Sequence, residues 1–432
     1  MNSMRYRRGV GAVALLATLL VVGCAGPAEA ATKRLLVVGD SWAGYVWEDR
    51  SFSQVFDDFG FTSVEEAGQA TALPGTTASF WKQPGNLAII GSELAANPTI
   101  DMVHLSLGGN DFLTQWNVNQ TPAQQQAIFD QVTADLQVIV DYILAQRPGV
   151  RVVIASYDYL NFFESVANNP AAQVSWAILG LPSARQLNDG LVGLSRAQQA
   201  VATRTARVEF VLNLGLMQWV YGYPAFSVPA NTAPFPGQAP NYAPFPGGLI
   251  DLPSPPAAMD NPGGLIDPIH LSFDGYYYYA YNAVAQYYAP WLQASLPAKA
   301  TNPSPGDGAG GISRTPALAW DAGAGATSHN VYFGPNGNLS FRANVAGTSF
   351  VPGTLNYSTN YAWRIDTVNG AGQVTTGDVW TFTVRAQPKS GCGTVPAAGA
   401  PVAMNAQNAL LPLVPMVLAL LVWGLMRRRA TS

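Results

Sequence analysis

Short apolar runs alternate with longer amphipathic segments over the first two thirds of the chain. The apolar runs predict buried strands at residues 34–39, 62–66, 102–107, 150–156 and 208–212. Apolar residues at helical spacing predict helices at 53–59, 122–146, 184–204 and 273–292. Strands that alternate with helices are typical of a parallel sheet covered by helices on both faces. We therefore expect an α/β domain over residues 33–296, with a ligand site at the carboxyl ends of its strands.

Residues 219–262 interrupt this rhythm with a segment rich in Pro, Gly and aromatic residues. The sequence APFPG occurs at 233–237 and again at 243–247, and GGLID occurs at 247–251 and again at 263–267. A connection of this length is usually either functional or mobile. We predict that it forms an ordered flap beside the ligand site.

The rest of the chain predicts a second, smaller domain between two linkers. Pro, Gly and Ser predominate at 297–313, which predicts a linker, and a second linker is expected at 387–408. Between them, residues 314–386 contain short alternating strands separated by Gly and Asn turns, the pattern of a β-sandwich. The sequences YAWRID, NG and WTF within this segment resemble a fibronectin type III repeat.

The amino-terminal residues 1–30 have the pattern of a secretory signal peptide. Three arginines precede an apolar run at 10–22, and the small residues Ala28 and Ala30 provide a cleavage site for signal peptidase. The sequence that ends at Cys24 also resembles a bacterial lipobox, in which Cys24 would become the lipidated first residue. Both kinds of processing remain open, and either predicts export.

The carboxyl-terminal region has the pattern of a membrane anchor. Residues 409–426 are almost wholly apolar, and the basic tail 427–432 begins with three arginines, so we predict a transmembrane helix with its basic end inside. With the short motif around Cys392, this tail resembles bacterial C-terminal sorting signals. We expect the chain at the bacterial cell surface or in the envelope membrane, with release into the medium as the alternative.

Composition and charge exclude several classes of function. The chain of 432 residues carries a formal net charge of −4 and has no basic segment outside its two ends, so nucleic-acid binding is not expected. Its two cysteines, Cys24 and Cys392, both lie in the processing segments. An internal disulfide and a zinc site made from cysteines are therefore excluded.

Three short motifs at predicted strand ends carry the candidate chemistry. Ser41 follows Gly39 and Asp40 at the end of the first strand, where its hydroxyl would lie at the carboxyl edge of the sheet. Asn110 follows two glycines after the third strand, at the same edge, where its side-chain amide could donate to a developing oxyanion. Each motif alone is also an ordinary turn sequence.

His270 is the one histidine placed to act as a base for Ser41. His104 lies inside a predicted buried strand, which indicates a core residue, and His329 belongs to the sandwich segment. Asp267 precedes His270 by three residues and could accept from the Nδ1–H of the imidazole, leaving Nε2 for the serine. Asp251 shares the local GGLID context but lacks a histidine three residues later, so we interpret it as structural.

The motifs Gly39-Asp40-Ser41, Gly108-Gly109-Asn110-Asp111 and Asp267-Pro268-Ile269-His270 resemble, in order and context, those of the SGNH (GDSL-type) serine hydrolases. The resemblance covers about residues 33–296. It implies a flavodoxin-like parallel sheet, a catalytic triad of Ser41, Asp267 and His270, and no metal or organic cofactor. It also implies an oxyanion hole formed by the Ser41 backbone N–H, the Asn110 amide and a glycine N–H. Gly75 is the preferred glycine and Gly68 the alternative.

The resemblance implies an esterase or lipase whose ester is a lipid, a short acyl ester or an acetylated glycan. Two alternatives remain at this point. One is an acyltransferase that uses the same triad, and the other is a surface glycan-binding or adhesion protein with an inactive hydrolase domain.

Overall fold

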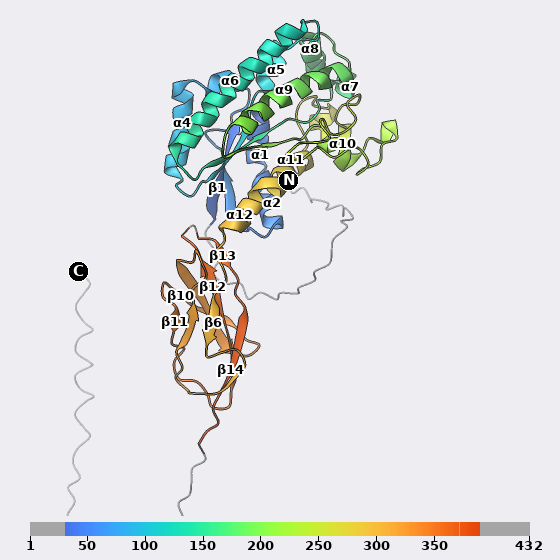
Figure 1. Cartoon of the computed structure of the whole chain (residues 1–432). Helices are drawn as coiled ribbons and strands as arrows, with labels where there is room; N and C mark the ends of the chain where they lie inside the picture. The colour runs from blue at the N-terminus through green and yellow to red at the C-terminus, as the bar shows by residue number, and fades with distance from the viewer. Residues whose placement is uncertain (1–30, 371, 389–432) are drawn as a thin grey trace, which may run out of the picture. The chain divides into compact units, whose positions relative to one another are not determined.

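A five-stranded parallel sheet forms the centre of the first domain in the computed structural model, which describes residues 31–370 and 372–388 (Figure 1). Its strands are β1 (Thr32–Gly39), β2 (Val64–Ala67), β3 (Met102–Ser106), β4 (Arg151–Ala155) and β5 (Val208–Val211). Their order is β2-β1-β3-β4-β5, and every pair is parallel. This is the flavodoxin-like order, in which the chain direction across the sheet reverses between β1 and β3. The predicted fold class of this domain is confirmed.

The central strands are apolar on both faces because helices cover the sheet on both sides. All five residues of β3 are buried, as are the last six of β1. On one face, α6 (Pro122–Gln146) contacts both α4 (Pro84–Ala96) and α9 (Ala184–Arg204). On the other, α2 (Ser51–Asp58) contacts both α1 (Ser41–Glu48) and α11 (Phe273–Ala283) (Figure 1).

Shorter helices lie in the connections. They are α3 (Ala78–Trp81), α5 (Gly109–Gln115), α7 (Phe162–Ser165), α8 (Pro170–Ile178), α10 (Leu216–Tyr221) and α12 (Ala289–Ser295). Single helical turns add η1 (Pro224–Phe226), η2 (Pro256–Ala258) and η3 (Pro262–Gly264).

The two longest helices begin and end where the sequence predicts. Each starts with a capping box, in which Thr121 or Ser183 accepts from a backbone N–H and a glutamine side chain bonds back to the cap. The predicted helix at 273–292 differs, because one π-helical turn, η4 (Val284–Tyr288), separates α11 from α12. This turn puts Tyr287 and Tyr288 on the buried side.

The flap at 219–262 is held against the domain by buried side-chain amides. Gln218 donates to the carbonyl oxygens of Leu252 (2.8 Å) and Pro253 (2.9 Å), and Asn188 donates to that of Leu252 (2.8 Å). Asn161 donates to the carbonyl oxygen of Ser254 (2.8 Å). These bonds satisfy backbone groups that have no secondary-structure partner, which explains how a coil rich in Pro and Gly keeps one conformation.

The second domain is a two-sheet sandwich. Its strands are β6 (Thr301–Ser304), β7 (Ala309–Ile312), β8 (Leu318–Asp321), β9 (Ser328–Pro335), β10 (Ser340–Val345), β11 (Ser349–Phe350), β12 (Asn360–Val368), β13 (Val374–Thr375) and β14 (Val379–Val384). One sheet runs β10-β9-β12-β14-β7, with β13 paired to β12, and the other runs β11-β8-β6. Trp320, Trp363 and Trp380 lie in the core between them.

The segment predicted as a linker, 297–313, contains two strands, β6 and β7, that the sequence pattern did not predict. β6 pairs with β8, and β7 pairs in parallel with β14, so both belong to the sandwich. Their residues are mostly exposed, and both strands lie at sheet edges, where Pro and Gly are tolerated. The Pro and Gly content that predicted a linker is therefore explained by the two edge strands.

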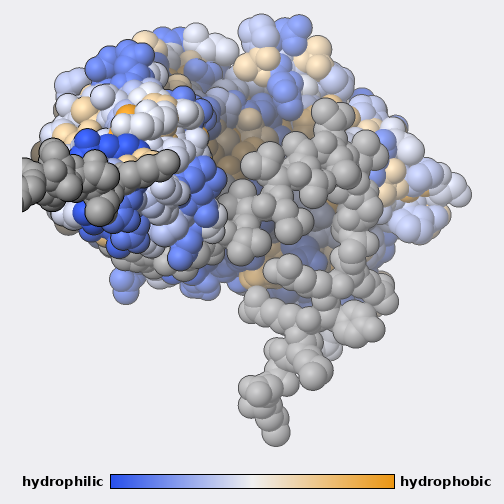
Figure 2. All heavy atoms as spheres, turned by 90° about the horizontal axis from the view of Figure 1, so that it is seen from below, coloured by the Kyte–Doolittle hydropathy of each residue, from blue (hydrophilic) through white to orange (hydrophobic). Residues whose placement is uncertain are grey.

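Several predicted segments lie outside the described residues: the signal segment 1–30 with Cys24, most of the linker 387–408 with Cys392, and the anchor 409–426 with its basic tail. Within residues 31–370 and 372–388, no helix has the length and apolar character needed to cross a membrane. On the face shown in Figure 2, hydrophilic residues predominate among those coloured and hydrophobic ones are interspersed between them.

Gly39 ends β1 where a side chain has no space. A Cβ on this residue would lie 2.1 Å from the carbonyl oxygen of Ser106 on the neighbouring strand. We expect Gly39→Ala to lower the free energy of unfolding by about 3 kcal/mol, because β1 and β3 would have to separate. Chemical denaturation measures this change.

Gly85→Ala is the matched control. Gly85 lies in α4, and a Cβ there would meet no atom within 4 Å. The control should shift the free energy of unfolding by less than about 1 kcal/mol, in the stabilising direction. Equal stability of the two variants would contradict the close approach of β1 and β3.

Candidate active site

Ser41 lies at the carboxyl edge of the sheet, as the first residue of α1. Asp40 is the N-cap of this helix, and its carboxylate accepts from the backbone N–H of Trp42 at 3.1 Å. The backbone N–H groups of a first helical turn have no partner within the helix. Ser41 is therefore at the N-terminal end of a helix, where the helix dipole favours negative charge.

The structure brings Ser41, His270 and Asp267 together, as the sequence predicts. His270 Nε2 lies 2.8 Å from Ser41 Oγ, and His270 Nδ1 lies 2.9 Å from Asp267 Oδ2. These distances fit a neutral imidazole that donates from Nδ1 to the carboxylate and accepts from the serine hydroxyl at Nε2. About a fifth of the His270 side chain is exposed, so a ligand can reach the pair.

Asp267 is also held by the backbone of its own turn. Its Oδ1 accepts from the N–H groups of Ile269 at 2.7 Å and His270 at 3.0 Å. Burial raises the pKa of Asp267, but the hydrogen bond from His270 and these two backbone bonds outweigh it, and the pKa lies below its usual value. The carboxylate is thus ionised at neutral pH and fixed in orientation.

Asn110 lies in the second turn-forming motif, at the start of α5. Its side-chain amide donates to the carbonyl oxygen of Thr76 at 2.8 Å, which leaves the second amide hydrogen for another acceptor. Asn110 and Ser41 line the same small cavity. The predicted convergence of these two side chains on one site is therefore present in the structure.

Gly75 and the alternative, Gly68, differ in their surroundings. The turn that contains Gly75 is bonded to the end of β1, because the Leu73 N–H and the Thr76 hydroxyl both donate to the carbonyl oxygen of Gly39. Gly75 is exposed with a φ of 79°, a conformation that favours glycine. Gly68 is buried against Trp47, so its position indicates a packing role.

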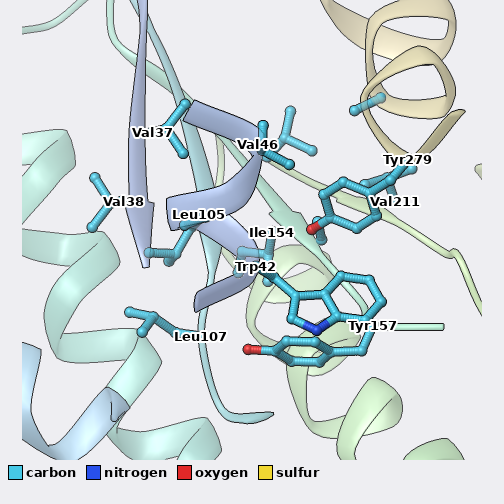
Figure 3. Close-up of a cluster of buried hydrophobic side chains, with 14 of the residues drawn as sticks. Val37, Val38, Trp42, Val46, Leu105, Leu107, Ile154, Tyr157, Val211 and Tyr279 are labelled. Carbon is cyan, nitrogen blue, oxygen red and sulfur yellow. The ribbon is translucent and has the colours of Figure 1, made fainter. Parts of the chain in front are cut away.

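Tyr157 links the serine loop to the Asn110 loop. Its hydroxyl donates to Asp40 Oδ2 at 2.5 Å and accepts from the backbone N–H of Gly109 at 2.9 Å. Its ring packs edge-on against Trp42, with centroids 5.1 Å apart, and Figure 3 shows the Trp42 indole close to the rings of Tyr157 and Tyr279. One buried side chain therefore fixes the relative positions of two strand ends.

The carboxyl group of Asp40 is buried in this network. Burial raises its pKa to about 7, although the hydrogen bonds from Tyr157 and from the Trp42 N–H work in the opposite direction. Since the folded-state pKa lies above the ordinary value of 3.8, this group's contribution to stability is largest in acid and is lost as the pH rises towards about 7.

Tyr157 and Asp111 have structural roles that the sequence does not predict, although Asp111 belongs to the motif Gly108-Gly109-Asn110-Asp111. Asp111 accepts from the Ala78 N–H at 2.8 Å and so ties α3, just after the Gly75 turn, to the Asn110 loop. Tyr157 lies two residues after the end of β4, and this position at the edge shared by the other motifs is the signal that the sequence offers.

His104 and His329 lie in the core and in the sandwich, as predicted, and Asp251 forms an ion pair at the surface. His104 is buried in β3 between the hydroxyls of Tyr288 (3.0 Å) and Tyr279 (3.2 Å), and burial lowers its pKa to about 3. His329 packs against Trp320 in the sandwich. Asp251 is exposed and pairs with Arg185 at 3.2 Å.

The cavity beside Ser41 has a volume of about 20 Å³. Trp42, Phe112, Leu113 and Leu191 contribute to its apolar wall. Among the residues that the structure describes, no group of three or more His, Cys, Asp or Glu side chains is arranged to hold a metal ion. The chemistry that this arrangement can support is nucleophilic attack by an activated serine next to hydrogen-bond donors for an oxyanion.

Comparisons with known proteins add no assignment. No protein-family model matches the chain, and no curated protein matches it. Among solved structures, it is 16% identical to the carbohydrate acetylesterase Est24 from Sinorhizobium meliloti, covering 60% of this chain and 99% of that one, with a TM-score of 0.35. The M. smegmatis aryl esterase is also 16% identical, with 61% and 99% covered and a TM-score of 0.35.

The sandwich is similar to an Fn3-like protein from Clostridium thermocellum, at 23% identity over 21% of this chain and 96% of that one, with a TM-score of 0.18. TM-scores this low establish neither a shared fold nor a shared activity, so the fold assignment depends on the strand order itself.

The Tyr157 link makes a prediction about stability and pH. Tyr157→Phe removes the hydroxyl that bonds to the Asp40 carboxyl and to the Gly109 N–H. This should lower the free energy of unfolding by about 1–3 kcal/mol. The loss should be larger at pH 8.5, where Asp40 is ionised, than at pH 5.5, because a hydrogen bond to a charged acceptor is stronger. Denaturant titrations at the two pH values measure the difference.

Tyr287→Phe is the control for this experiment. The Tyr287 hydroxyl donates to the carbonyl oxygen of Phe210 at 2.8 Å, so no carboxylate accepts its proton. Tyr287→Phe should therefore lower the free energy of unfolding by the same amount at both pH values. If Tyr157→Phe lowers the free energy of unfolding by the same amount at both pH values, the Tyr157 hydroxyl does not donate to an ionised Asp40.

Proposed function

We propose that this chain is a serine ester hydrolase of the SGNH type, with Ser41 as the nucleophile, His270 as the general base and Asp267 as the residue that orients the base. The observation that supports this most directly is the pair of hydrogen bonds from His270, 2.8 Å to Ser41 Oγ and 2.9 Å to Asp267 Oδ2. Because these three residues come from two distant parts of the chain, local turn formation does not explain their alignment.

In the first half-reaction, His270 Nε2 takes the proton from Ser41 as Oγ attacks the ester carbonyl carbon. The resulting imidazolium is stabilised by the ionised Asp267. The tetrahedral intermediate collapses when the bond between carbon and the alkoxy oxygen breaks, and His270 returns the proton to the leaving alcohol. The acyl group is then bonded to Ser41 Oγ.

In the second half-reaction, water replaces the alcohol. His270 takes a proton from the water as its oxygen attacks the acyl carbon, and Ser41 leaves with that proton. The products are a carboxylic acid and the free enzyme. Apart from the ester and water, every group in these steps belongs to the chain.

Three donors are proposed for the oxyanion: the Ser41 backbone N–H, the Asn110 amide and the Gly75 backbone N–H. Ser41 and Asn110 line the same cavity, and the carbonyl oxygen of Thr76 holds the Asn110 amide in place. The Gly109 N–H is already bonded to Tyr157, so it is not proposed as a donor.

We further propose that the enzyme is exported and held at the bacterial cell surface or membrane by residues 409–426, with the sandwich domain between enzyme and anchor. The support is the sequence pattern of the two ends. The intact mass of the exported chain separates cleavage after Ala30 from lipidation at Cys24. The proposed substrates are esters of the three predicted classes, namely lipid esters, short acyl esters and acetylated glycans.

Replacing the nucleophile is the primary test. Ser41→Ala should lower kcat for p-nitrophenyl acetate by about 10⁴-fold or more, since the acyl-enzyme cannot form. The circular-dichroism spectrum and the unfolding midpoint should stay close to those of the wild type.

Ser92→Ala provides the control, because Ser92 is exposed on α4 and its hydroxyl bonds only to the carbonyl oxygen of Ala88 among its described contacts. This variant should keep full activity. Wild-type turnover in a folded Ser41→Ala protein would eliminate Ser41 as the nucleophile.

The oxyanion assignment predicts a different kinetic effect. Asn110→Ala should reduce kcat for the same ester by about 10²–10³-fold and leave KM nearly unchanged, because the amide stabilises charge that develops only in the transition state. Asn119→Ala, at an exposed position after the same helix, is the control. A rise in KM with kcat unchanged would instead indicate that Asn110 binds the ground state.

A further inference from the structure

Two cavities of very different size meet at Leu160. The first is the cavity beside Ser41, and its volume of about 20 Å³ holds roughly one water-sized group. The second has a volume of about 520 Å³, within the usual range of small-molecule sites. Leu160 lines both, so the two cavities adjoin at this residue.

Two further observations show that the cavities are neighbours. Leu191 lines the small cavity and Leu187 the large one, and these residues lie one turn apart on the same face of α9. Next to Leu160, the Asn161 N–H donates to the carbonyl oxygen of Pro268 at 2.8 Å. The wall of the large cavity is therefore bonded directly to the turn that holds Asp267 and His270.

The large cavity, called the aromatic pocket from here on, has a predominantly apolar lining. Its wall includes Phe162, Phe163, Trp176, Phe226 and Leu252. Phe163 is 62% exposed and Phe226 42% exposed, with their ring centroids 6.3 Å apart. Two phenylalanines this exposed at the mouth of a cavity are typical of a binding site.

The charged groups at the pocket are already paired with each other. Arg185 binds Asp189 at 3.0 Å and Asp251 at 3.2 Å, and all three side chains are at least half exposed. The Trp176 indole N–H donates to the carbonyl oxygen of Pro182 at 3.0 Å. With its charges compensated, the pocket favours an uncharged, apolar ligand, and its phenylalanine pair favours a flat aromatic one.

We propose that the aromatic pocket binds the alcohol half of the substrate, an apolar aromatic alcohol, and that the cavity beside Ser41 accepts an acyl group of about acetyl size. This inference rests on the proposed function. The carbonyl carbon must lie between Ser41 and Asn110, and the cavity there has room for about one methyl-sized group. The larger half of the ester needs more space than this cavity offers, and the aromatic pocket is the neighbouring cavity that offers it.

The test compares one variant on two acetate esters that differ in the alcohol. Phe163→Ala/Phe226→Ala should raise KM for 2-naphthyl acetate by about 10-fold, because both aromatic walls are removed. For methyl acetate, followed by acid release, kcat/KM should stay within about two-fold of the wild type. Both phenylalanines are substantially exposed, so the variant is expected to fold.

Phe341→Ala is the matched control, since Phe341 is a comparably exposed phenylalanine of the sandwich domain. It should leave both esters unaffected. An unchanged KM for 2-naphthyl acetate in the double variant, or an equal loss on both esters, would overturn the proposal. Faster wild-type hydrolysis of 2-naphthyl hexanoate than of the acetate would also overturn it, because the acyl chain would then occupy the large cavity.

A binding measurement separates failure of this inference from failure of the proposed function. Fluorescence titration of the Ser41→Ala protein with 2-naphthol requires no catalysis. Saturable binding that weakens about 10-fold when Phe163→Ala/Phe226→Ala is added supports the pocket even if no ester is hydrolysed. Absence of binding to the folded Ser41→Ala protein contradicts the pocket even if p-nitrophenyl acetate is a substrate.

Discussion

The hydrogen bond from the Tyr157 hydroxyl to the Asp40 carboxyl joins the parts of the molecule on which the site depends. Asp40 caps the helix that begins with Ser41, and Tyr157 also accepts from the Gly109 N–H beside Asn110. Three strands, β1, β3 and β4, therefore end in one buried network. Because parallel strands bring their carboxyl ends to a single edge, this network can fix a nucleophile and an oxyanion donor with few side chains.

The network also explains how the loops around Ser41 stay in place without regular structure. The Gly75 turn is bonded to Gly39, the start of α3 is bonded to Asp111, and the Asn110 amide is bonded to Thr76. Each of these bonds joins a side chain to a backbone group of a different segment. A site built from three loops thereby gains the rigidity that preorganised donors need.

The parts of this structure that follow from local chemistry could be predicted from the sequence. The helices that begin after Thr121 and Ser183 have caps, and the five strands are short apolar runs with turn residues after them. The contact between Ser41 and His270 was predictable because few histidines compete for the role. In each of these cases, the signal lies in neighbouring residues or in the scarcity of one residue type.

What could not be predicted depends on packing between distant segments. Tyr157 is one of 18 tyrosines, and nothing in its neighbours indicates that its hydroxyl reaches Asp40. The strands β6 and β7 have the composition of a linker because edge strands need little apolar burial. The two cavities likewise draw their walls from distant segments, among them Leu187 and Leu191 of α9 and Leu252 of the flap. Size selection by the two cavities is therefore a property of the tertiary structure.

The central claim is that His270 activates the Ser41 hydroxyl, and a fluorophosphonate probe tests it most directly because the probe reacts only with an activated serine. Tandem mass spectrometry of the labelled chain should find a single phosphonyl adduct, on Ser41, whose rate of formation falls steeply in His270→Ala. An adduct on another serine, or no adduct in a correctly folded protein, would contradict the account.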